Sequence, residues 1–231
     1  MATRPIFIPE TDDVCGAKEK LVDFKWFSGF AKSQKQKSIV ELHSTARTLG
    51  FEKVLEVSSK SEDELGICLS AFNLTITTPR NNNRFTVETA FQGSKVFAKG
   101  GPYKDLFGMD SLAAKKDIRL KESGNLIAFE FYDKKFPLEP KTFFYDWLYI
   151  NALVQNKELA DSVVKYDCFT DIEFNPQKSI NCQAHAVALY VSLHKHNQLE
   201  TALSSPSDFL SILSNHYNKQ KRNVGAQSTL I

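Results

Sequence analysis

Residues 87–95, VETAFQGSK, are the stretch that decides how this chain is interpreted. If they form a helix, one face carries four of their side chains, because residues three, four and seven positions apart share a side. These are Glu88, Phe91, Gln92 and Lys95. The face therefore offers an acid, an amide and an amine around one aromatic ring. It is either a site of chemistry or an ordinary helix with Phe91 in the core and solvated charges at its border.

The flanking sequence predicts the limits of this helix. Thr86 is a suitable N-cap, and the Gly-Gly-Pro sequence at 100–102 favours a helix end, so the helix is expected over about 87–99. Before it, LSAFNLTITTP at 69–79 alternates apolar side chains and predicts a strand with one covered face. A polar turn, RNNNR at 80–84, would join the two elements.

Helices predominate in the rest of the predicted structure. Apolar spacing favours helices over 33–50, over 141–166 in one or two pieces, over 180–196 and from Ser205 onward. The last has a good start signal, since Ser205 can cap it, Pro206 suits the first turn and Asp208 follows three residues after the cap. Buried strands are expected at 53–59 and 125–132, whereas the start of the chain reads as irregular. Few strands among many helices indicate the α+β class.

Composition restricts the classes of function. At 231 residues, with 42% hydrophobic and 24% charged residues, the chain is expected to fold as one globular domain. A formal charge of +2 is too small to indicate sequence-independent binding of phosphate backbones. No run approaches the ~20 apolar residues of a membrane span, and the start lacks the apolar stretch of a signal peptide. We therefore expect a cytoplasmic protein that does not contact a membrane.

Two loops are candidates for phosphate contacts. Ser58, Ser59 and Lys60 follow a predicted strand, a common place for such contacts in proteins that mix helices and strands. In the second loop, the backbone N–H groups around Gly101 could receive a phosphate while Tyr103 covers a ring. Plain solvated turns are the alternative in both cases, because no P-loop or dinucleotide-binding glycine pattern occurs.

An aromatic and basic segment lies near the amino end, at 24–38. It interleaves two kinds of side chain, the aromatic Trp26, Phe27 and Phe30 and the basic Lys32, Lys35 and Lys37. Aromatic stacking surface beside positive charge suits single-stranded nucleic acid. A packed turn that leads into a solvated helix is the other reading.

Metal chemistry has little support. Cys182 with His185, and His194 with His196, do not assemble the four-ligand spacing of a zinc site. No metal or other cofactor is predicted. The G-x-S-x-G signature of serine hydrolases is also missing from the sequence.

These segments together resemble the NADAR (YbiA-like) family. VETAFQGSK is similar to its SEHYFQAQK signature, with Glu88, Phe91, Gln92 and Lys95 in register. Upstream, LSAFNLTI resembles the FSNF strand of the family, at a matching distance from Ser70 to Glu88. Downstream, SLAAKKDIRL is similar to the segment A-x-x-x-G-R, although an aspartate and an isoleucine stand where the glycine is expected.

Two later segments extend the resemblance, which spans about 64–193. TDIEF resembles the family's NDAYW and makes Asp171 the second acid. INCQAHAVALY resembles the terminal N-R-L-G-x-x-L-M helix, in which Asn181 matches and the arginine does not. The phrasings FQGSKVF with GGPY, and FNPQKSINCQA, resemble the branch of NADAR proteins that accompanies DarT toxins.

The resemblance implies a fold and an activity. The fold is one helix-rich NADAR-like α+β domain around a small sheet over 1–231, with 1–60 as an N-terminal extension packed on it and 219–231 as a loose tail. The activity is that of an antitoxin enzyme that removes ADP-ribose from guanine bases in DNA. Its implied partners are ADP-ribosylated single-stranded DNA as substrate, ADP-ribose as product and a DarT-type toxin as genetic partner.

Three catalytic roles follow from the resemblance and the chemistry of N-glycosidic bonds. Glu88 would stabilise the positive charge that develops at the anomeric carbon. Lys95 would attack that carbon as a neutral amine and form a Schiff base, or would only hold a phosphate. Asp171 would activate water or position a ribose hydroxyl.

The remaining candidates bind substrate. They are Ser59, Lys60, Gly101 and Tyr103 for diphosphate or adenine, Ser70 and Gln92 for ribose hydroxyls, Asn181, and Trp26 with the segment up to Lys37 for nucleic acid. Two other classes of function stay open at this stage. One is a non-catalytic protein that binds single-stranded nucleic acid or the toxin, and the other is a hydrolase of small N-ribosides.

Overall fold

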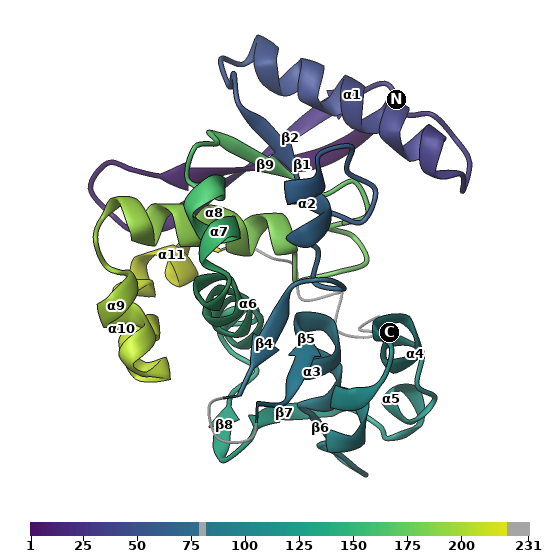
Figure 1. Cartoon of the computed structure of the whole chain (residues 1–231), viewed down its shortest axis with the longest axis vertical. Helices are drawn as coiled ribbons and strands as arrows, with labels where there is room; N and C mark the ends of the chain where they lie inside the picture. Colours follow the sequence, from purple (N-terminus) through teal and green to yellow (C-terminus); the bar gives the residue numbers. More distant parts are fainter. Residues whose placement is uncertain (79–81, 221–231) are drawn as a thin grey trace.

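The computed structural model of the protein describes residues 1–78 and 82–220. A four-stranded sheet lies in the part of the molecule that contains the N-terminus (Figure 1). In the order β2-β1-β9-β3, its strands are Gly16–Phe24, Ala2–Glu10, Cys168–Thr170 and Val54–Glu56. β1 and β2 form a long antiparallel hairpin, whereas β3 and β9 run parallel and end side by side at Glu56 and Thr170.

Two helices cover the two faces of this sheet. Neighbouring strand residues point to opposite faces, so Ile6 packs with α1 (Lys32–Thr48) while Phe7 packs with α8 (Gln183–Lys195). Contacts of α1 with β2 and β3, and of α8 with β1, β2 and β9, agree with this arrangement (Figure 1). The sheet is therefore the middle layer of three.

Shorter strands build the opposite end of the molecule, below the sheet in Figure 1. They are the antiparallel pair β4 (Thr75–Thr77) and β5 (Arg84–Thr86) and the sheet β6-β7-β8 (Lys95–Phe97, Leu126–Phe131 and Lys134–Phe136). Between them lies α3 (Val87–Gly93), which packs on the buried helix α6 (Phe143–Gln155). Because α6 also contacts α8 and β4, it connects the two ends of the fold.

Phenylalanine rings fill the space between α3, β7 and α6. The ring centroids of Phe129 and Phe144 are 4.7 Å apart, those of Phe91 and Phe129 are 5.3 Å apart, and those of Phe136 and Phe144 are 4.8 Å apart. The 18 phenylalanines of the sequence thus serve mainly as core, which is the common use of such side chains.

Short helices complete the described part of the chain. They are α2 (Glu64–Cys68), the 3₁₀ helix η1 (Lys104–Gly108), α4 (Ser111–Lys115), α5 (Arg119–Glu122), α7 (Lys157–Val163), α9 (Leu199–Ser204), α10 (Pro206–Ile212) and α11 (Ser214–Lys219). In the described residues, every helix is too short or too polar to cross a membrane.

The structure confirms the α+β class and most of the long elements. Helices α1, α6 with α7, α8 and α10 lie where apolar spacing predicts them, as do strands β3 and β7. The predicted caps are also present, since the hydroxyl of Thr86 accepts a hydrogen bond from the N–H of Thr89 and that of Ser205 accepts one from Asp208. Local sequence signals were sufficient because most of these helices are long or strongly capped and the two strands follow apolar runs.

One prediction is wrong and two elements are shorter than predicted. The start of the chain is the β1–β2 hairpin rather than irregular. The expected strand at 69–79 shrinks to β4, because the chain turns at Ser70, whose carbonyl accepts from two N–H groups further along. The helix from Thr86 ends at Gly93, so Lys95 begins strand β6, where pairing with β7 replaces the helical hydrogen bonds.

Some predictions fall outside what the structure tests. Residues 80 and 81 of the expected polar turn, and 221–231 of the expected tail, lie outside the described residues. The division between an N-terminal extension and the remainder at residue 60 stays a prediction. In the structure, β1 of that segment pairs with β9 from the far end of the chain.

Substitutions of two phenylalanines test whether the hairpin belongs to the cooperative core. Phe7 is 0% exposed and contacts the rings of Phe174 and His185, whereas Phe30 is fully exposed at 103%. We expect Phe7→Ala to lower the free energy of unfolding by about 3–5 kcal/mol because it leaves a cavity. Phe30→Ala should change it by less than about 0.5 kcal/mol. Urea unfolding measures both, and equal effects would show that the hairpin is not part of the core.

Candidate active site

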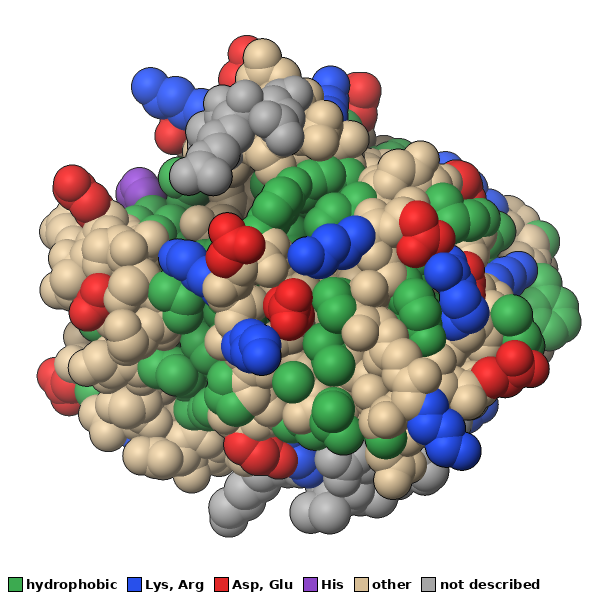
Figure 2. Space-filling model, turned by 90° about the horizontal axis from the view of Figure 1, so that it is seen from below, with side chains coloured by type: hydrophobic (Ala, Val, Ile, Leu, Met, Phe, Trp, Pro, Cys, Tyr) green, Lys and Arg blue, Asp and Glu red, His purple; other side chains and the backbone are tan. Residues whose placement is uncertain are grey.

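A cavity of about 600 Å³ opens between the two ends of the fold. Its walls come from segments far apart in the sequence, namely the loop after β3, the turn at Ser70, α3 with the start of β6, α4, and the turn after β9. On the face that Figure 2 shows, acidic and basic side chains are interspersed among hydrophobic ones. On that face no field of one sign stands out.

Glu88 and Gln92 line the cavity from α3. Each is only 6% exposed, and the Gln92 Nε2 donates a hydrogen bond of 2.9 Å to the Glu88 Oε1. The Gln92 Oε1 is buried without a hydrogen-bond partner and can accept from a ligand. The reading of this stripe as a solvated helix border is therefore wrong.

Lys95 reaches the same cavity from the first position of β6 rather than from α3. Its side chain is 3% exposed, and its ammonium lies 5.0 Å from the centre of the Phe91 ring. Burial lowers the pKa of Lys95 to about 8, an effect that the Glu88 carboxylate opposes and the Lys115 ammonium reinforces. An appreciable fraction of the amine is thus neutral near physiological pH.

Asp171 faces the cavity from the turn after β9. Its Oδ1 accepts hydrogen bonds from the backbone N–H groups of Glu173, at 3.0 Å, and Phe174, at 3.2 Å. Burial, and next the Glu56 carboxylate, raise the pKa of Asp171 to about 8. A carboxyl group with such a pKa keeps its proton at neutral pH and can donate it.

Four predicted substrate-binding residues also line the cavity. They are Ser59, Lys60, Ser70 and Asn181. The Asn181 Oδ1 is a second buried acceptor without a hydrogen-bond partner. Ser70 is held in place from α6, because the Tyr149 hydroxyl donates to the carbonyl of Leu69, at 2.5 Å.

Three other predicted residues lie elsewhere. Gly101 and Tyr103 do not line the cavity, since the Tyr103 hydroxyl bonds that of Ser123 and its ring lies 4.5 Å from the Arg119 guanidinium. Gly101 instead supports Lys95 from behind, because a Cβ on Gly101 would overlap the carbonyl oxygen of Lys95. The φ of +85° at Gly101 also favours glycine.

Trp26 also lies outside the cavity, and it is connected to the cavity wall through Lys35 and Glu173. Its ring packs on Phe24, and the Lys35 ammonium lies 4.7 Å from its centre. Lys35 in turn pairs at 3.2 Å with Glu173, which does line the cavity. The contribution of Trp26 to the site is therefore indirect.

Three lysines that sequence reasoning missed complete the lining. They are Lys115, Lys116 and Lys121, on or beside α4 and α5. The Lys115 Nζ is 3.8 Å from the Glu88 Oε1 and 5.1 Å from the centre of the Phe72 ring. For Lys115 and Lys116 the signal was the lysine pair in the segment SLAAKKDIRL, and Lys121 follows directly after that segment.

Comparison with known families agrees with this arrangement. A family model described as the DarT1-associated NADAR antitoxin matches residues 2–223. The chain belongs to the NADAR family. The match includes the β1–β2 hairpin and α9 to α11, which the resemblance in the sequence did not reach. No curated protein matches the chain.

Membership in NADAR gives the cavity its general context. The chain belongs with antitoxins of DarT toxin–antitoxin systems, in a family of ADP-ribose glycohydrolases. A carboxylate, an amine of lowered pKa and a protonated carboxyl group around one cavity suit such a family, because cleavage of a ribosyl bond develops positive charge that needs a carboxylate and a leaving group that needs a proton.

Two glycines of this NADAR domain test the support behind Lys95. Gly101→Ala places a Cβ against the Lys95 carbonyl at a positive φ, so it should lower the free energy of unfolding by about 1–3 kcal/mol. Gly108→Ala is the matched control, because nothing lies within 4 Å of its Cβ. Urea unfolding should show a change below about 0.5 kcal/mol for the control. Equal stability of the two variants would contradict the assigned support.

Proposed function

We propose that this NADAR protein hydrolyses the N-glycosidic bond between ADP-ribose and a guanine base in single-stranded DNA. In a DarT system it would thereby restore the base that the toxin modifies. The observation that carries the proposal is the burial of Glu88, Lys95 and Asp171 around one cavity. A protein that merely binds nucleic acid or the toxin would need none of these three groups out of water, where burying each costs free energy.

The cavity suits the ADP-ribosyl group in size and polarity. Its volume of about 600 Å³ is within the range of pockets for small organic ligands. The diphosphate would lie against Lys60, Lys116 and Lys121, with Ser59 as a further donor. The ribose hydroxyls would donate to the unpartnered oxygens of Gln92 and Asn181, which gives these buried acceptors their missing hydrogen bonds.

Bond cleavage would use the two carboxyl groups differently. As the bond from the anomeric carbon to the guanine nitrogen breaks, the electron pair leaves with the base and positive charge develops on the sugar. The Glu88 carboxylate would stabilise that charge, with the Gln92 amide holding it in position. Asp171, protonated at neutral pH, would give its proton to the leaving nitrogen.

Lys95 has two possible parts in this reaction. In the first, its neutral amine attacks the anomeric carbon as the guanine leaves, the sugar ring opens to a Schiff base, and water hydrolyses the Schiff base to release ADP-ribose and the free amine. In the second, water attacks directly, and Lys95 remains an ammonium that holds a phosphate. The lowered pKa of Lys95 favours the first route, because only the neutral amine is nucleophilic.

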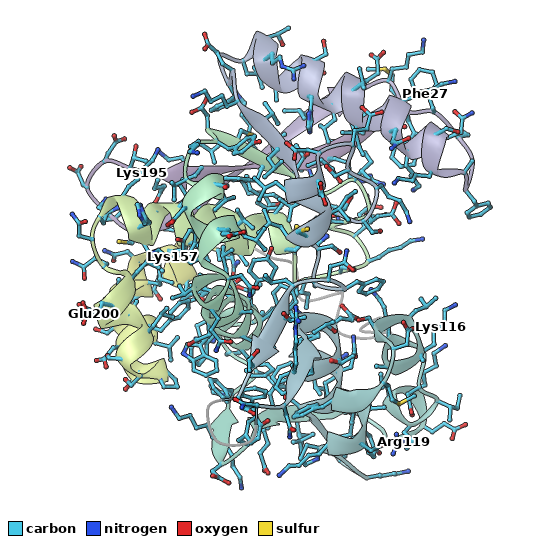
Figure 3. The ribbon with its side chains drawn as sticks, viewed as in Figure 1. Phe27, Lys116, Arg119, Lys157, Lys195 and Glu200 are labelled. Atoms are coloured by element: carbon cyan, nitrogen blue, oxygen red, sulfur yellow. The ribbon has the colours of Figure 1, made fainter. Side chains whose placement is uncertain are left out.

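The DNA strand would lie along the start of α1. The Lys25 and Lys37 ammonium groups lie 5.0 and 5.9 Å from the centre of the Phe27 ring, and the nearby Phe30 ring is fully exposed. Figure 3 places Phe27 at this end of the molecule, on the same side as Lys116 of the cavity wall. Aromatic rings with lysines beside them suit the stacked bases of a single strand and the phosphates that join those bases.

Glu88→Gln tests the main catalytic assignment. The amide keeps the shape of the side chain but not its charge, so release of ADP-ribose from a modified oligonucleotide should fall by about 10²–10³-fold. Binding of free ADP-ribose should remain. Glu122→Gln, on the exposed part of α5, is the control and should retain full activity. Turnover by Glu88→Gln at the wild-type rate would refute the role of Glu88.

Borohydride trapping separates the two routes for Lys95. If a Schiff base forms, reduction during turnover should leave ADP-ribose attached to Lys95, found by peptide mass spectrometry. Trapping should rise toward about pH 8 as the neutral amine of Lys95 accumulates, and fall at higher pH as Asp171 loses the proton that the leaving nitrogen needs. Lys95→Arg should abolish the adduct and Lys104→Arg, an exposed control, should not. Turnover by the wild-type protein without an adduct would favour direct attack by water.

A further inference from the structure

Glu56 is a buried acid that no sequence motif singled out. It ends β3, beside Thr170 at the end of the parallel strand β9, and is 2% exposed. Residues at the carboxyl ends of adjacent parallel strands commonly lie near ligands. Glu56 does not line the cavity itself, and it lies directly behind two segments that do.

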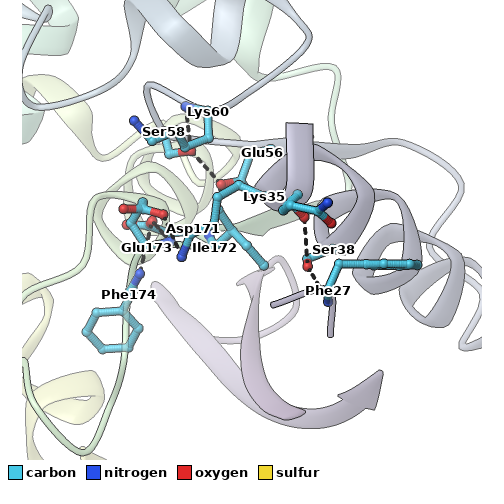
Figure 4. Close-up of polar contacts among 11 residues, drawn as sticks. Phe27, Lys35, Ser38, Glu56, Ser58, Lys60, Asp171, Ile172, Glu173 and Phe174 are labelled. Atoms are coloured by element: carbon cyan, nitrogen blue, oxygen red, sulfur yellow. Dashed lines mark hydrogen bonds and ion pairs between the residues drawn. The ribbon is translucent and has the colours of Figure 1, made fainter. Parts of the chain in front are cut away.

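The carboxylate of Glu56 holds these two segments together, as Figure 4 shows. Its Oε1 accepts from the Ser58 hydroxyl at 2.6 Å and from the Ile172 N–H at 2.8 Å, and its Oε2 accepts from the Thr170 hydroxyl at 2.6 Å. The Ser58 Oγ then accepts from the N–H of Lys60 at 3.1 Å. The loop 58–60 and the turn at Asp171 are thus bound to one buried group.

We propose that Glu56 is a positioning residue of the proposed reaction, which aligns the phosphate-binding loop with the turn of Asp171 and holds the proton of Asp171 in place through its negative charge. This inference rests on the proposed function. A purely structural link would not require a charge, because a neutral side chain of the same shape could make hydrogen bonds to two hydroxyls, and burying a carboxylate is costly.

The charge states of Glu56 and Asp171 agree with these roles, in which Glu56 is ionised and Asp171 is protonated. Burial raises the pKa of Glu56, but its three donors favour the ionised form and oppose that shift. Asp171 has two backbone donors, and Glu56 is the largest charged contribution to its raised pKa. Glu56 therefore ionises first, and Asp171 keeps its proton to about pH 8.

The other titratable groups around Asp171 contribute less. Glu173, on the same turn, is half-exposed and paired with Lys35 of α1, so solvent and that ammonium screen it. Cys182, the N-cap of α8, and the tyrosines of α6 also face Asp171, and burial raises the pKa of Tyr145 and Tyr149 well above the ordinary value.

Two more groups approach this region from other elements. His43 of α1 bonds the Thr170 hydroxyl, and burial lowers its pKa to about 4, so it is uncharged at neutral pH. Glu88 and Lys95 also line the cavity, but neither contributes to the raised pKa of Asp171 as much as Glu56 does. Glu56 thus remains the principal charge acting on Asp171.

Glu56→Gln in the full-length protein tests the charge. Without the negative charge the pKa of Asp171 must fall, whether Asp171 acts as an acid or as a base. The limb of the pH–rate profile due to Asp171 should therefore move by roughly one unit to lower pH. ¹³C-carboxyl NMR titration of Asp171, without substrate, should show the same displacement. An unmoved limb and an unmoved NMR titration would overturn the proposal.

Ser58→Ala separates alignment from charge. It removes one hydrogen bond to Glu56 and leaves the carboxylate, so KM for the oligonucleotide should rise several-fold while the pH limb stays in place. A shifted limb in this variant would count against the charge as the cause.

The NMR titration keeps the inference testable in two other cases. If Glu56→Gln fails to fold, the NMR titration of the wild-type protein tests the coupling instead. Coupled carboxyl groups of Glu56 and Asp171 should each show two titration steps, whereas a single independent step for each would overturn the proposal. If the wild-type protein does not act on the oligonucleotide, the proposed function fails, and the NMR displacement still tests the coupling of Glu56 to Asp171.

Discussion

The site depends on one physical constraint, which is that the fold takes ionisable side chains out of water and leaves them around one cavity. Glu88, Lys95 and Asp171 are each at most 6% exposed, and the aromatic core around α6 lies behind them. The loose contact of 3.8 Å between Lys115 and Glu88 compensates only part of the cost of burial. The remaining cost appears as altered pKa values, so Lys95 can be neutral and Asp171 protonated at a pH where exposed side chains of their types are charged.

Assembly of this cavity requires segments from all parts of the chain. The loop after β3, the turn at Ser70, the junction of α3 with β6 and the turn after β9 meet because α6 and α8 connect the two ends of the fold. Gln183, at the start of α8, illustrates the connection, since its amide donates to the Val57 carbonyl and accepts from the Ala71 N–H, at 2.6 and 2.7 Å. A site built in this way is sensitive to distant packing, which is why Gly101, outside the cavity, still affects Lys95.

Sequence reasoning succeeded where the signal was local. The cap at Thr86 and the membership of Glu88, Gln92 and Lys95 in one cavity could be predicted from a short stretch. The backbone conformation at Lys95 could not be predicted, because a helix and a strand would both place its side chain on the side of Glu88. Only the pairing of β6 with β7 shows that Lys95 belongs to a strand.

The rest of the site depends on contacts that no local pattern encodes. Tyr103 resembled a ligand-covering ring but packs with Arg119, and Lys116, which no motif singled out, lines the cavity. Glu56 was hidden in an apparently ordinary strand, since its partners Thr170 and Ile172 come from the far end of the chain. The N-terminal hairpin was missed although β1 and β2 are adjacent in the sequence, because Pro5 and Pro9 within β1 argue against a strand. The measurement that tests the account most directly is the mass of both products after the wild-type protein acts on a single-stranded oligonucleotide with one ADP-ribosylated guanine. The account predicts free ADP-ribose and an unmodified strand in equal amounts. A strand that keeps the whole group, or keeps a phosphoribosyl remnant after cleavage of the diphosphate, would contradict it.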